Sequence, residues 1–272
     1  MESAHSSAAA TAWVVVGLDN GGNCNNATVL DAGGRFLVDE LVENPSRVND
    51  GPDRAVDSLA DSLHNVLELT STPLTAVRAI GLDTPGRASA NGVISSTGAT
   101  NFSQPAWRGF DFRGALETRL GIPVVYNNDG NAAALYAHYV FFGDHATAIT
   151  KSSISAIVGT GLGGGVIEGG KVVKGAAGMA GELGHVHIPL DGLLEPGQPV
   201  PICNCGFTSD AESVASLTAI EKNLLPYWLT QFPDHELASL PPLAAAKKVR
   251  GLAEAGDPMS LRIFDQQAAA IG

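Results

Sequence analysis

A dense cluster of glycines between residues 157 and 185 is the feature that most constrains how this chain can fold. An apolar run, Ser155–Val158, breaks into Gly159-Thr160-Gly161-Leu162-Gly163-Gly164-Gly165 and resumes at Val166–Ile167. Glycines at this density let backbone N–H groups approach an anion without interference from Cβ atoms, and they supply φ > 0 where a tight turn needs it. A hairpin that merely joins two strands is the simpler interpretation of such a turn taken alone.

A second glycine cluster follows and ends in Gly181-Glu182-Leu183-Gly184-His185. It places a carboxylate and an imidazole close in sequence to the predicted phosphate loop. This combination indicates phosphoryl transfer to a polar small molecule.

At these residues the chain resembles the ROK family, which is named for repressors, open reading frames and sugar kinases. The resemblance rests on Val158, Gly161-Leu162-Gly163, Gly165-Val166, Gly175, Gly181 and Gly184-His185. It implies an α/β fold of the actin/hexokinase (ribonuclease H-like) type, in which two lobes close over a nucleotide and a sugar. It also implies that ATP phosphates bind at Gly159, Thr160, Gly161, Gly163 and Gly164.

The composition agrees with a metabolic enzyme of two lobes. The chain has 272 residues, 44% of them hydrophobic, which is enough for two cores. A net charge of −12 without a basic patch argues against nucleic acid or an anionic membrane as a partner. Three cysteines cannot make a disulfide framework, so we expect a cytoplasmic location.

We expect a disordered tail at residues 1–12, which lacks the features of a signal peptide, and lobes at residues 13–128 and 129–272. Family members continue beyond the last predicted helix into an adenosine-contacting loop and a closing helix. The second lobe is therefore expected to be incomplete at its C-terminus, and the family resemblance favours a homodimer.

The first predicted strand, Trp13–Leu18, runs into Asp19, and Gly21, Gly22 and Asn23 follow it. Ala27–Leu30 is predicted as the return strand and Phe36–Val42 as a third. An Asp with paired glycines is also ordinary turn chemistry. The functional alternative is that Asp19 holds Mg²⁺ directly or through water while the glycines donate N–H groups to phosphates. The segment resembles the family's first phosphate motif, with Asn23 where the family has Thr.

Later in this lobe, a helix is predicted over Asp53–Glu68 and a strand over Val77–Leu82. A helix over Phe112–Leu120 follows. The turn at Gly86 resembles the family's sugar-side Pro-Gly turn, and Asn101 stands where family members have an Asn near the sugar pocket. A turn asparagine is the simpler explanation of Asn101.

The strand Ile122–Tyr126 ends at Asn127-Asn128-Asp129-Gly130-Asn131 and an Ala-rich helix follows. Asp129 could merely cap this helix. The run resembles the family's Asn-Asp-Ala-Asn-Ala-Ala motif, which implies that Asp129 is the general base for the sugar hydroxyl and that Asn128 binds a neighbouring hydroxyl.

In the second lobe the family resemblance implies that Glu182, His185 and Glu212 contact the sugar. Cys203-Asn204-Cys205-Gly206 and Asp210 resemble the family's zinc segment, but Asp210 stands where the family has a third Cys. Because zinc also accepts carboxylate oxygen, His185, Cys203, Cys205 and Asp210 could form a tetrahedral structural site. Two unmetallated cysteines in a turn are the alternative.

The sequence thus predicts an ATP- and Mg²⁺-dependent kinase for a hexose, glucokinase-like in type. A kinase for an amino sugar or a C7-cyclitol remains open, because the loop before Cys203 is long and the zinc segment is altered. A sugar-binding pseudo-kinase, or a ROK-type regulator without a DNA-binding domain, is the remaining alternative. Retention of both Asp19 and Asp129 weighs against it.

Overall fold

The structure of the protein is a computed structural model that describes residues 13–86, 88–95, 102–176 and 178–272. The expected tail at residues 1–12 and the predicted sugar contact Asn101 lie outside the described residues. The chain divides into two compact units. Unit 1 comprises residues 1–132 and 174–179, and unit 2 comprises residues 133–173 and 180–272.

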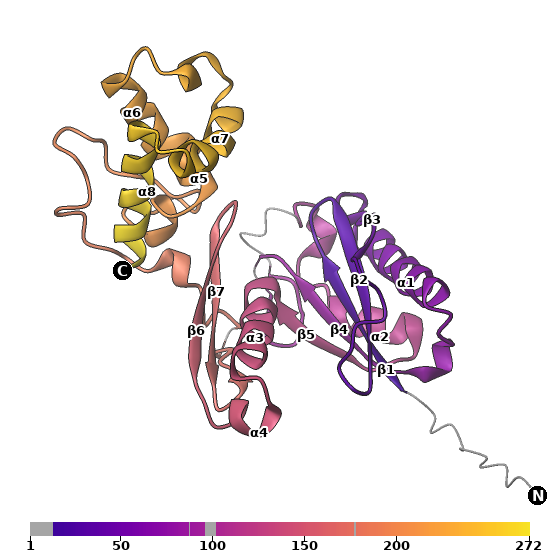
Figure 1. The fold of residues 1–272 in the computed structure, drawn as a ribbon. Helices are drawn as coiled ribbons and strands as arrows, with labels where there is room; N and C mark the ends of the chain where they lie inside the picture. Colours follow the sequence, from indigo (N-terminus) through magenta and orange to yellow (C-terminus); the bar gives the residue numbers. More distant parts are fainter. Residues whose placement is uncertain (1–12, 87, 96–101, 177) are drawn as a thin grey trace, which may run out of the picture. The chain divides into compact units, whose positions relative to one another are not determined.

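Unit 1 is built on a five-stranded mixed sheet (Figure 1). The strands lie in the order β3-β2-β1-β4-β5. Strand β2 is antiparallel to both β3 and β1, whereas β4 is parallel to both β1 and β5. They span Val14–Asn20 (β1), Cys24–Asp31 (β2), Val42–Pro45 (β3), Val77–Thr84 (β4) and Val124–Asn128 (β5).

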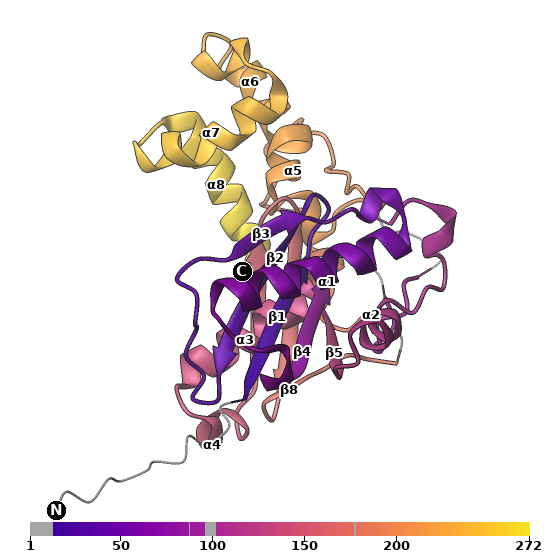
Figure 2. The same ribbon diagram turned by 90° about the vertical axis from the view of Figure 1, so that its right-hand side faces the viewer.

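One face of this sheet is buried under two helices. Along β1 every second residue is buried, including Val16 and Leu18. These side chains join one core with Leu59 and Leu63 of α1 (Pro52–Leu69), and α1 runs along the sheet (Figure 2). Helix α2 (Phe112–Leu120) packs on α1. Burial of each such side chain contributes roughly 1.5–3 kcal/mol. The residues between them on β1, Asp19 among them, are therefore on the opposite face of the sheet.

The predicted return strand and the helices Asp53–Glu68 and Phe112–Leu120 are confirmed, but the predicted third strand, Phe36–Val42, is wrong. Phe36 makes only an isolated bridge to Leu30, and β3 begins at Val42. The chain leaves the sheet between them at the exposed residues Asp39 and Glu40. Charged side chains gain nothing from the sheet there and stay in water.

In unit 2, a three-stranded antiparallel sheet has the order β6-β7-β8, of which β6 and β7 are labelled in Figure 1 and β8 in Figure 2. Helix α3 begins in unit 1 and continues into unit 2, where its buried residue His138 contacts Ser153 of β6 and the carbonyl of Ala148 in α4. These elements span Asp129–Phe142 (α3), His145–Ala148 (α4), Ser153–Val158 (β6), Leu162–Glu168 (β7) and Lys171–Val172 (β8).

The C-terminal helices share a second apolar core, which includes Trp228, Val249, Ile263 and, from β7, Leu162. Asp257 caps the last helix by accepting a hydrogen bond from the N–H of Ser260, as Asp-Pro at a helix start predicts. The helices span Leu217–Ala219 (α5), Leu225–Gln231 (α6), Pro242–Glu254 (α7) and Pro258–Ile271 (α8), with a π-helical turn at Ile220–Leu224. Among the described residues, no helix combines the length and apolarity needed to cross a membrane.

Candidate active site

Three aspartates of unit 1 interact at the carboxyl ends of its parallel strands. Asp19 and Asp83 are direct partners in the β1–β4 register, and Asp83 is in turn opposite Asn127 of β5. Burial, a hydrogen bond to the Asp19 carboxylate and the nearby Asp129 together raise the pKa of Asp83 to about 8. Asp19 also accepts a hydrogen bond from Asn26 Nδ2 at 2.9 Å. A carboxylate cluster at this position suits a divalent cation or a proton transfer.

Asp83 was not identified from the sequence, although it directly follows a predicted strand. The sequence does not show which residue of the neighbouring strand is paired with Asp19, and this pairing is what identifies Asp83. In the structure β1 and β4 are parallel neighbours, and their register pairs Asp19 with Asp83 near the carboxyl ends of both strands.

Asp129 is the first residue of α3, directly after β5. Surrounding atoms partly desolvate its carboxyl and raise its pKa, and Asp19 acts in the same direction. The N–H of Gly130 donates to Asp129 Oδ1 at 2.7 Å, which opposes this shift. The residue nevertheless keeps contact with solvent. A partly desolvated carboxylate with access to water can accept a proton and release it.

Asn128, not Asp129, has the helix-capping contact that the sequence suggested for Asp129. Asn128 Oδ1 accepts a hydrogen bond from the N–H of Asn131 at 3.3 Å, and its Nδ2 donates to the carbonyl of Gly86 at 3.3 Å. Gly86 has φ 81°, which favours glycine. The predicted sugar-side residues Gly86, Asn128 and Asp129 are thus neighbours in unit 1.

The first predicted phosphate turn joins β1 to β2. The N–H of Gly21 donates to the carbonyl of Cys24 at 2.9 Å, and a Cβ atom on Gly21 would stand 2.7 Å from that oxygen. The carbonyl of Asn23 accepts from the N–H of Ser46. Gly21 is therefore required by space, and the turn with Gly22 and Asn23 is fixed next to Asp19.

The second predicted phosphate loop is shorter in the structure than the sequence indicated. The turn proper is Gly159-Thr160-Gly161, and Gly163 and Gly164 already belong to β7. A Cβ atom on Gly164 would stand 2.5 Å from the carbonyl oxygen of Ser155, so this glycine allows β6 and β7 to pack closely.

The first two residues of helix α5, Leu217 and Thr218, hold the second loop through hydrogen bonds. The carbonyl of Gly159 accepts a hydrogen bond from the N–H of Leu217 at 2.9 Å. The carbonyl of Thr160 accepts from Thr218 through its N–H and its hydroxyl. Within the described part of the chain, the N–H groups of Thr160 and Gly161 have no hydrogen-bond partner. Two free N–H donors in a glycine turn are suited to a phosphate oxygen.

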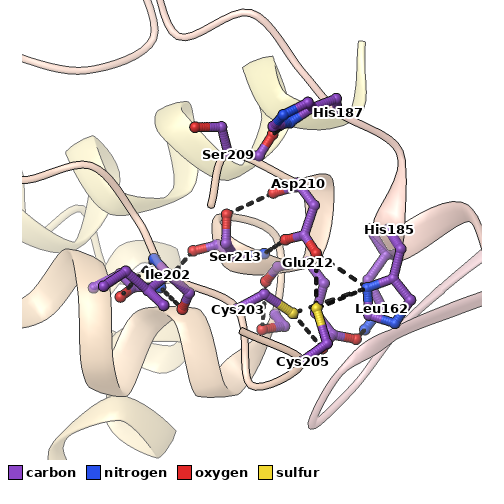
Figure 3. A network of polar contacts seen from close by, with 12 residues as sticks. Leu162, His185, His187, Ile202, Cys203, Cys205, Ser209, Asp210, Glu212 and Ser213 are labelled. Carbon is purple, nitrogen blue, oxygen red and sulfur yellow. Dashed lines mark hydrogen bonds and ion pairs between the residues drawn. The ribbon is translucent and has the colours of Figure 1, made fainter. Parts of the chain in front are cut away.

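The predicted zinc ligands His185, Cys203, Cys205 and Asp210 are brought together in unit 2 (Figure 3). Their ligand atoms all lie within 4.8 Å of one another. His185 Nδ1 is 3.0 Å from Asp210 Oδ2 and 3.7 Å from Cys205 Sγ. A tetrahedral zinc ion with bonds of about 2.0–2.3 Å separates its ligand atoms by about 3.3–3.8 Å, which lies within the range of separations in this cluster. The donor set therefore fits a zinc ion.

Burial and hydrogen bonding shift the pKa values of Cys203 and Asp210 in this cluster in opposite directions. Burial raises the pKa of the Cys203 thiol, and Asp210 has a side chain only 2% exposed. Burial also works to raise the pKa of Asp210, but hydrogen bonds from His185 and Cys203 outweigh it and lower that pKa. Asp210 also accepts from the N–H of Ser213 at 2.9 Å through its other oxygen, which fixes the carboxylate.

Two further predicted sugar contacts lie beside the cluster. Glu182 directly precedes the 3-10 turn Leu183–His185. Glu212 accepts hydrogen bonds from the N–H of Leu162 and from the Cys203 thiol. The imidazole of His185 turns Nδ1 toward the cluster, so Nε2 is the atom available to a ligand outside it.

A model of the ROK family matches residues 15–272. The chain belongs to the ROK family. It is 33% identical to a glucokinase of Halalkalibacterium halodurans over 94% of this chain and 73% of the relative. The predicted family is thereby confirmed.

Solved structures agree with this assignment. A ROK hexokinase from Thermus thermophilus has a TM-score of 0.68 and 32% identity, covering 95% of this chain and 74% of the other. A ROK family glucokinase from Streptomyces griseus, determined with glucose and AMPPNP, has a TM-score of 0.67 and 27% identity over 94% of this chain and 76% of the other. The predicted α/β fold of the actin/hexokinase type is confirmed.

Proposed function

We propose that this ROK protein is an ATP-dependent hexose kinase that transfers the γ-phosphoryl group to a hydroxyl of a glucose-like sugar, with Asp129 as the general base. The observation that carries the proposal is the position of Asp129, at the end of β5 and among the carboxylates of β1 and β4, in a chain similar to a glucokinase over 94% of its length. A carboxylate at a strand-to-helix junction is where α/β folds place their chemistry.

In the proposed reaction, Asp129 accepts the proton of the attacking sugar hydroxyl as the bond from that oxygen to the γ-phosphorus forms. The bond from the γ-phosphorus to the β,γ-bridging oxygen breaks, and ADP leaves. The raised pKa makes Asp129 a stronger base than an ordinary carboxylate while it is ionised. Solvent access lets the proton leave afterwards. Phosphoryl transfer needs mostly positioning and charge stabilisation, so one base near the hydroxyl is enough.

For the nucleotide, we assign the turns Gly21–Asn23 and Gly159–Gly161 to the phosphates. The unpartnered N–H groups of Thr160 and Gly161 support this assignment within the described residues. Mg²⁺ bound with ATP neutralises phosphate charge, and Asp19 would hold it, directly or through water, with Asp83 as the adjacent carboxyl group.

For the sugar, we assign Gly86, Asn128 and Asp129 of unit 1 and Glu182, His185 and Glu212 of unit 2, with Asn101 carried by family resemblance. Hydroxyl groups are recognised by paired acceptors and donors in a dry site, and carboxylates, amides and imidazoles supply both. The specific sugar depends on pocket shape.

We also assign a structural Zn²⁺ to His185, Cys203, Cys205 and Asp210. Zinc would bind two thiolates, an imidazole nitrogen and a carboxylate oxygen and would stabilise the loop that carries His185 and Glu212. A cytoplasmic homodimer completes the proposal. The free state of the described cysteines supports the cytoplasmic location. The family resemblance supports the homodimer.

A coupled ADP-release assay across hexoses, amino sugars and C7-cyclitols tests the function. We expect turnover with glucose or a close analogue. Asp129→Asn should lower kcat by about 10²–10⁴-fold with little change in sugar affinity, because the lost group moves a proton. Asp234→Asn, at an exposed aspartate of unit 2, is the matched control. Sugar binding without ADP release in the parent protein would favour a pseudo-kinase instead.

A further inference from the structure

Glu212 contacts two separate segments through its two carboxylate oxygens (Figure 3). Oε2 accepts a hydrogen bond from the N–H of Leu162 at 2.9 Å, at the end of the glycine turn. Oε1 accepts from the thiol of Cys203 at 3.3 Å. The backbone of Glu212 is also held, because its carbonyl accepts from Ser216 Oγ at 2.9 Å. Hydrogen bonds at both carboxylate oxygens and at the backbone carbonyl thus fix the orientation of the Glu212 side chain.

The neighbouring glycines fit around this carboxylate. A Cβ atom on Gly161 would stand 2.7 Å from Glu212 Oε2, and one on Gly184 would stand 3.2 Å from Glu212 Cβ. Neither glycine has a left-handed φ. A Cβ atom on Gly184 would also stand 2.2 Å from the carbonyl oxygen of Leu162, so space requires glycine there. At Gly161 an added methyl could be accommodated only if the Glu212 carboxylate moved aside. A Cβ atom on Gly159 or Gly163 would meet nothing within 4 Å.

The contact determines which donors of the turn remain available. The helix that begins at Leu217 occupies the carbonyls of Gly159 and Thr160, and Glu212 occupies the N–H of Leu162. In the described part of the molecule, the N–H groups of Thr160 and Gly161 are then left for an anion.

We propose that Glu212 is a positioning residue that fixes the Gly159–Leu162 turn for the phosphates of the nucleotide. It acts through the N–H of Leu162 and touches no phosphate, because a carboxylate repels a phosphate group. This inference rests on the proposed kinase function and adds a role to Glu212 besides sugar binding. Hydrogen bonding, not negative charge, is the property that matters.

A double-mutant cycle tests the contact without using activity. Gly161→Ala should lower the melting temperature and speed hydrogen exchange at the Leu162 N–H, because the added methyl displaces the carboxylate. In a Glu212→Ala background the same change should have little further effect, so the two effects are non-additive. Gly163→Ala is the matched control and should leave the melting temperature unchanged. An effect of Gly161→Ala that is equally large in both backgrounds would overturn the proposal.

Binding of AMPPNP, measured by calorimetry, tests the consequence for the nucleotide. Glu212→Ala should raise the Kd for AMPPNP about fivefold, the effect of losing one buried hydrogen bond. Glu212→Gln should stay within about twofold of the parent protein, because the amide oxygen still accepts from Leu162. Equal losses in both variants, or an unchanged Kd in Glu212→Ala, would refute the positioning role.

The two tests separate this inference from the proposed function. If the parent protein does not bind AMPPNP, the kinase proposal fails together with the nucleotide role of Glu212. The double-mutant cycle still reports whether Glu212 fixes the turn. Glucose affinity, measured on the same variants, reports the sugar role independently, and a loss there alone in Glu212→Ala would count against the positioning role.

Discussion

The two units assemble their candidate site residues in different ways. In unit 1, Asp19, Asp83 and Asn127 are aligned by the backbone register of three adjacent parallel strands. In unit 2, His185, Cys203 and Asp210 come from irregular segments and meet through side-chain contacts. A register is fixed by many backbone hydrogen bonds, whereas a loop cluster depends on a few side chains and on what binds to them. Unit 1 should therefore tolerate the loss of a site side chain, while unit 2 should not.

The largest expected effect is the loss of stability caused by a substitution that disturbs the backbone of unit 1. Gly21→Ala places a methyl 2.7 Å from the Cys24 carbonyl oxygen, and a backbone atom cannot move aside cheaply. We expect a loss of about 2–3 kcal/mol in the free energy of unfolding. Chemical denaturation measures it. Gly81→Ala on β4, where the added methyl stands 4.0 Å from its nearest neighbour, is the control and should cost much less.

The next prediction tests whether the strand register, by pairing Asp83 with Asp19, raises the pKa of Asp83. The pKa of Asp83 is raised to about 8, so the folded protein keeps a proton that the unfolded chain releases near pH 4. Stability should then fall as pH rises from about 4 to about 8 and level off above that. Asp83→Asn should remove this fall and make the protein more stable than the parent at pH 9.

Denaturation curves between pH 4 and pH 9 in the presence of EDTA check the Asp83 prediction. Asp234→Asn should leave the pH dependence unchanged. If the stability of the parent protein and that of Asp83→Asn changed with pH in the same way across this range, the pKa of Asp83 would not be raised by its environment.

In unit 2 the corresponding test concerns metal binding. Asp210→Asn keeps an oxygen for the N–H of Ser213 but removes the negative charge from the cluster. We expect zinc affinity to fall at least tenfold, about 1.4 kcal/mol, because a neutral amide is a much weaker ligand. Competition with a chromophoric chelator gives the affinity. Unchanged zinc affinity would remove Asp210 from the ligand set.

The smallest expected effect concerns Lys174, in the segment of residues 174–179 that belongs to unit 1. Its Nζ donates to the carbonyls of Tyr126 at 2.8 Å and Ala90 at 3.3 Å, and burial lowers its pKa. Lys174→Met should cost about 1 kcal/mol, because two carbonyls lose a donor while the apolar stem is retained. Thermal unfolding measures the loss, with Lys151→Met at an exposed position as control.

Local sequence signals predicted the elements well where one periodicity was dominant. The β-branched run of β1 and the apolar spacing of α1 were sufficient to predict a strand and a helix. The strand expected at Phe36–Val42 failed because apolar residues there suggested a sheet partner that only β2 could supply, and β2 instead pairs with Val42–Pro45. The sequence also suggested Asp129 as a possible helix cap, whereas Asn128 makes that contact. Neighbouring Asn and Asp residues cap helices equally well, so the sequence alone could not choose between them.

The sequence by itself determined the family, the strand ends that carry Asp19 and Asp129, and the four residues whose possible metal-ligand atoms lie together in unit 2. Short motifs keep these side chains recognisable wherever the chain places them. Only the tertiary structure decided that Asp83 joins Asp19 and that Glu212 contacts Leu162. Both contacts join residues more than forty positions apart in the chain. Strand order and loop packing set such contacts, and neither leaves a local signature in the sequence.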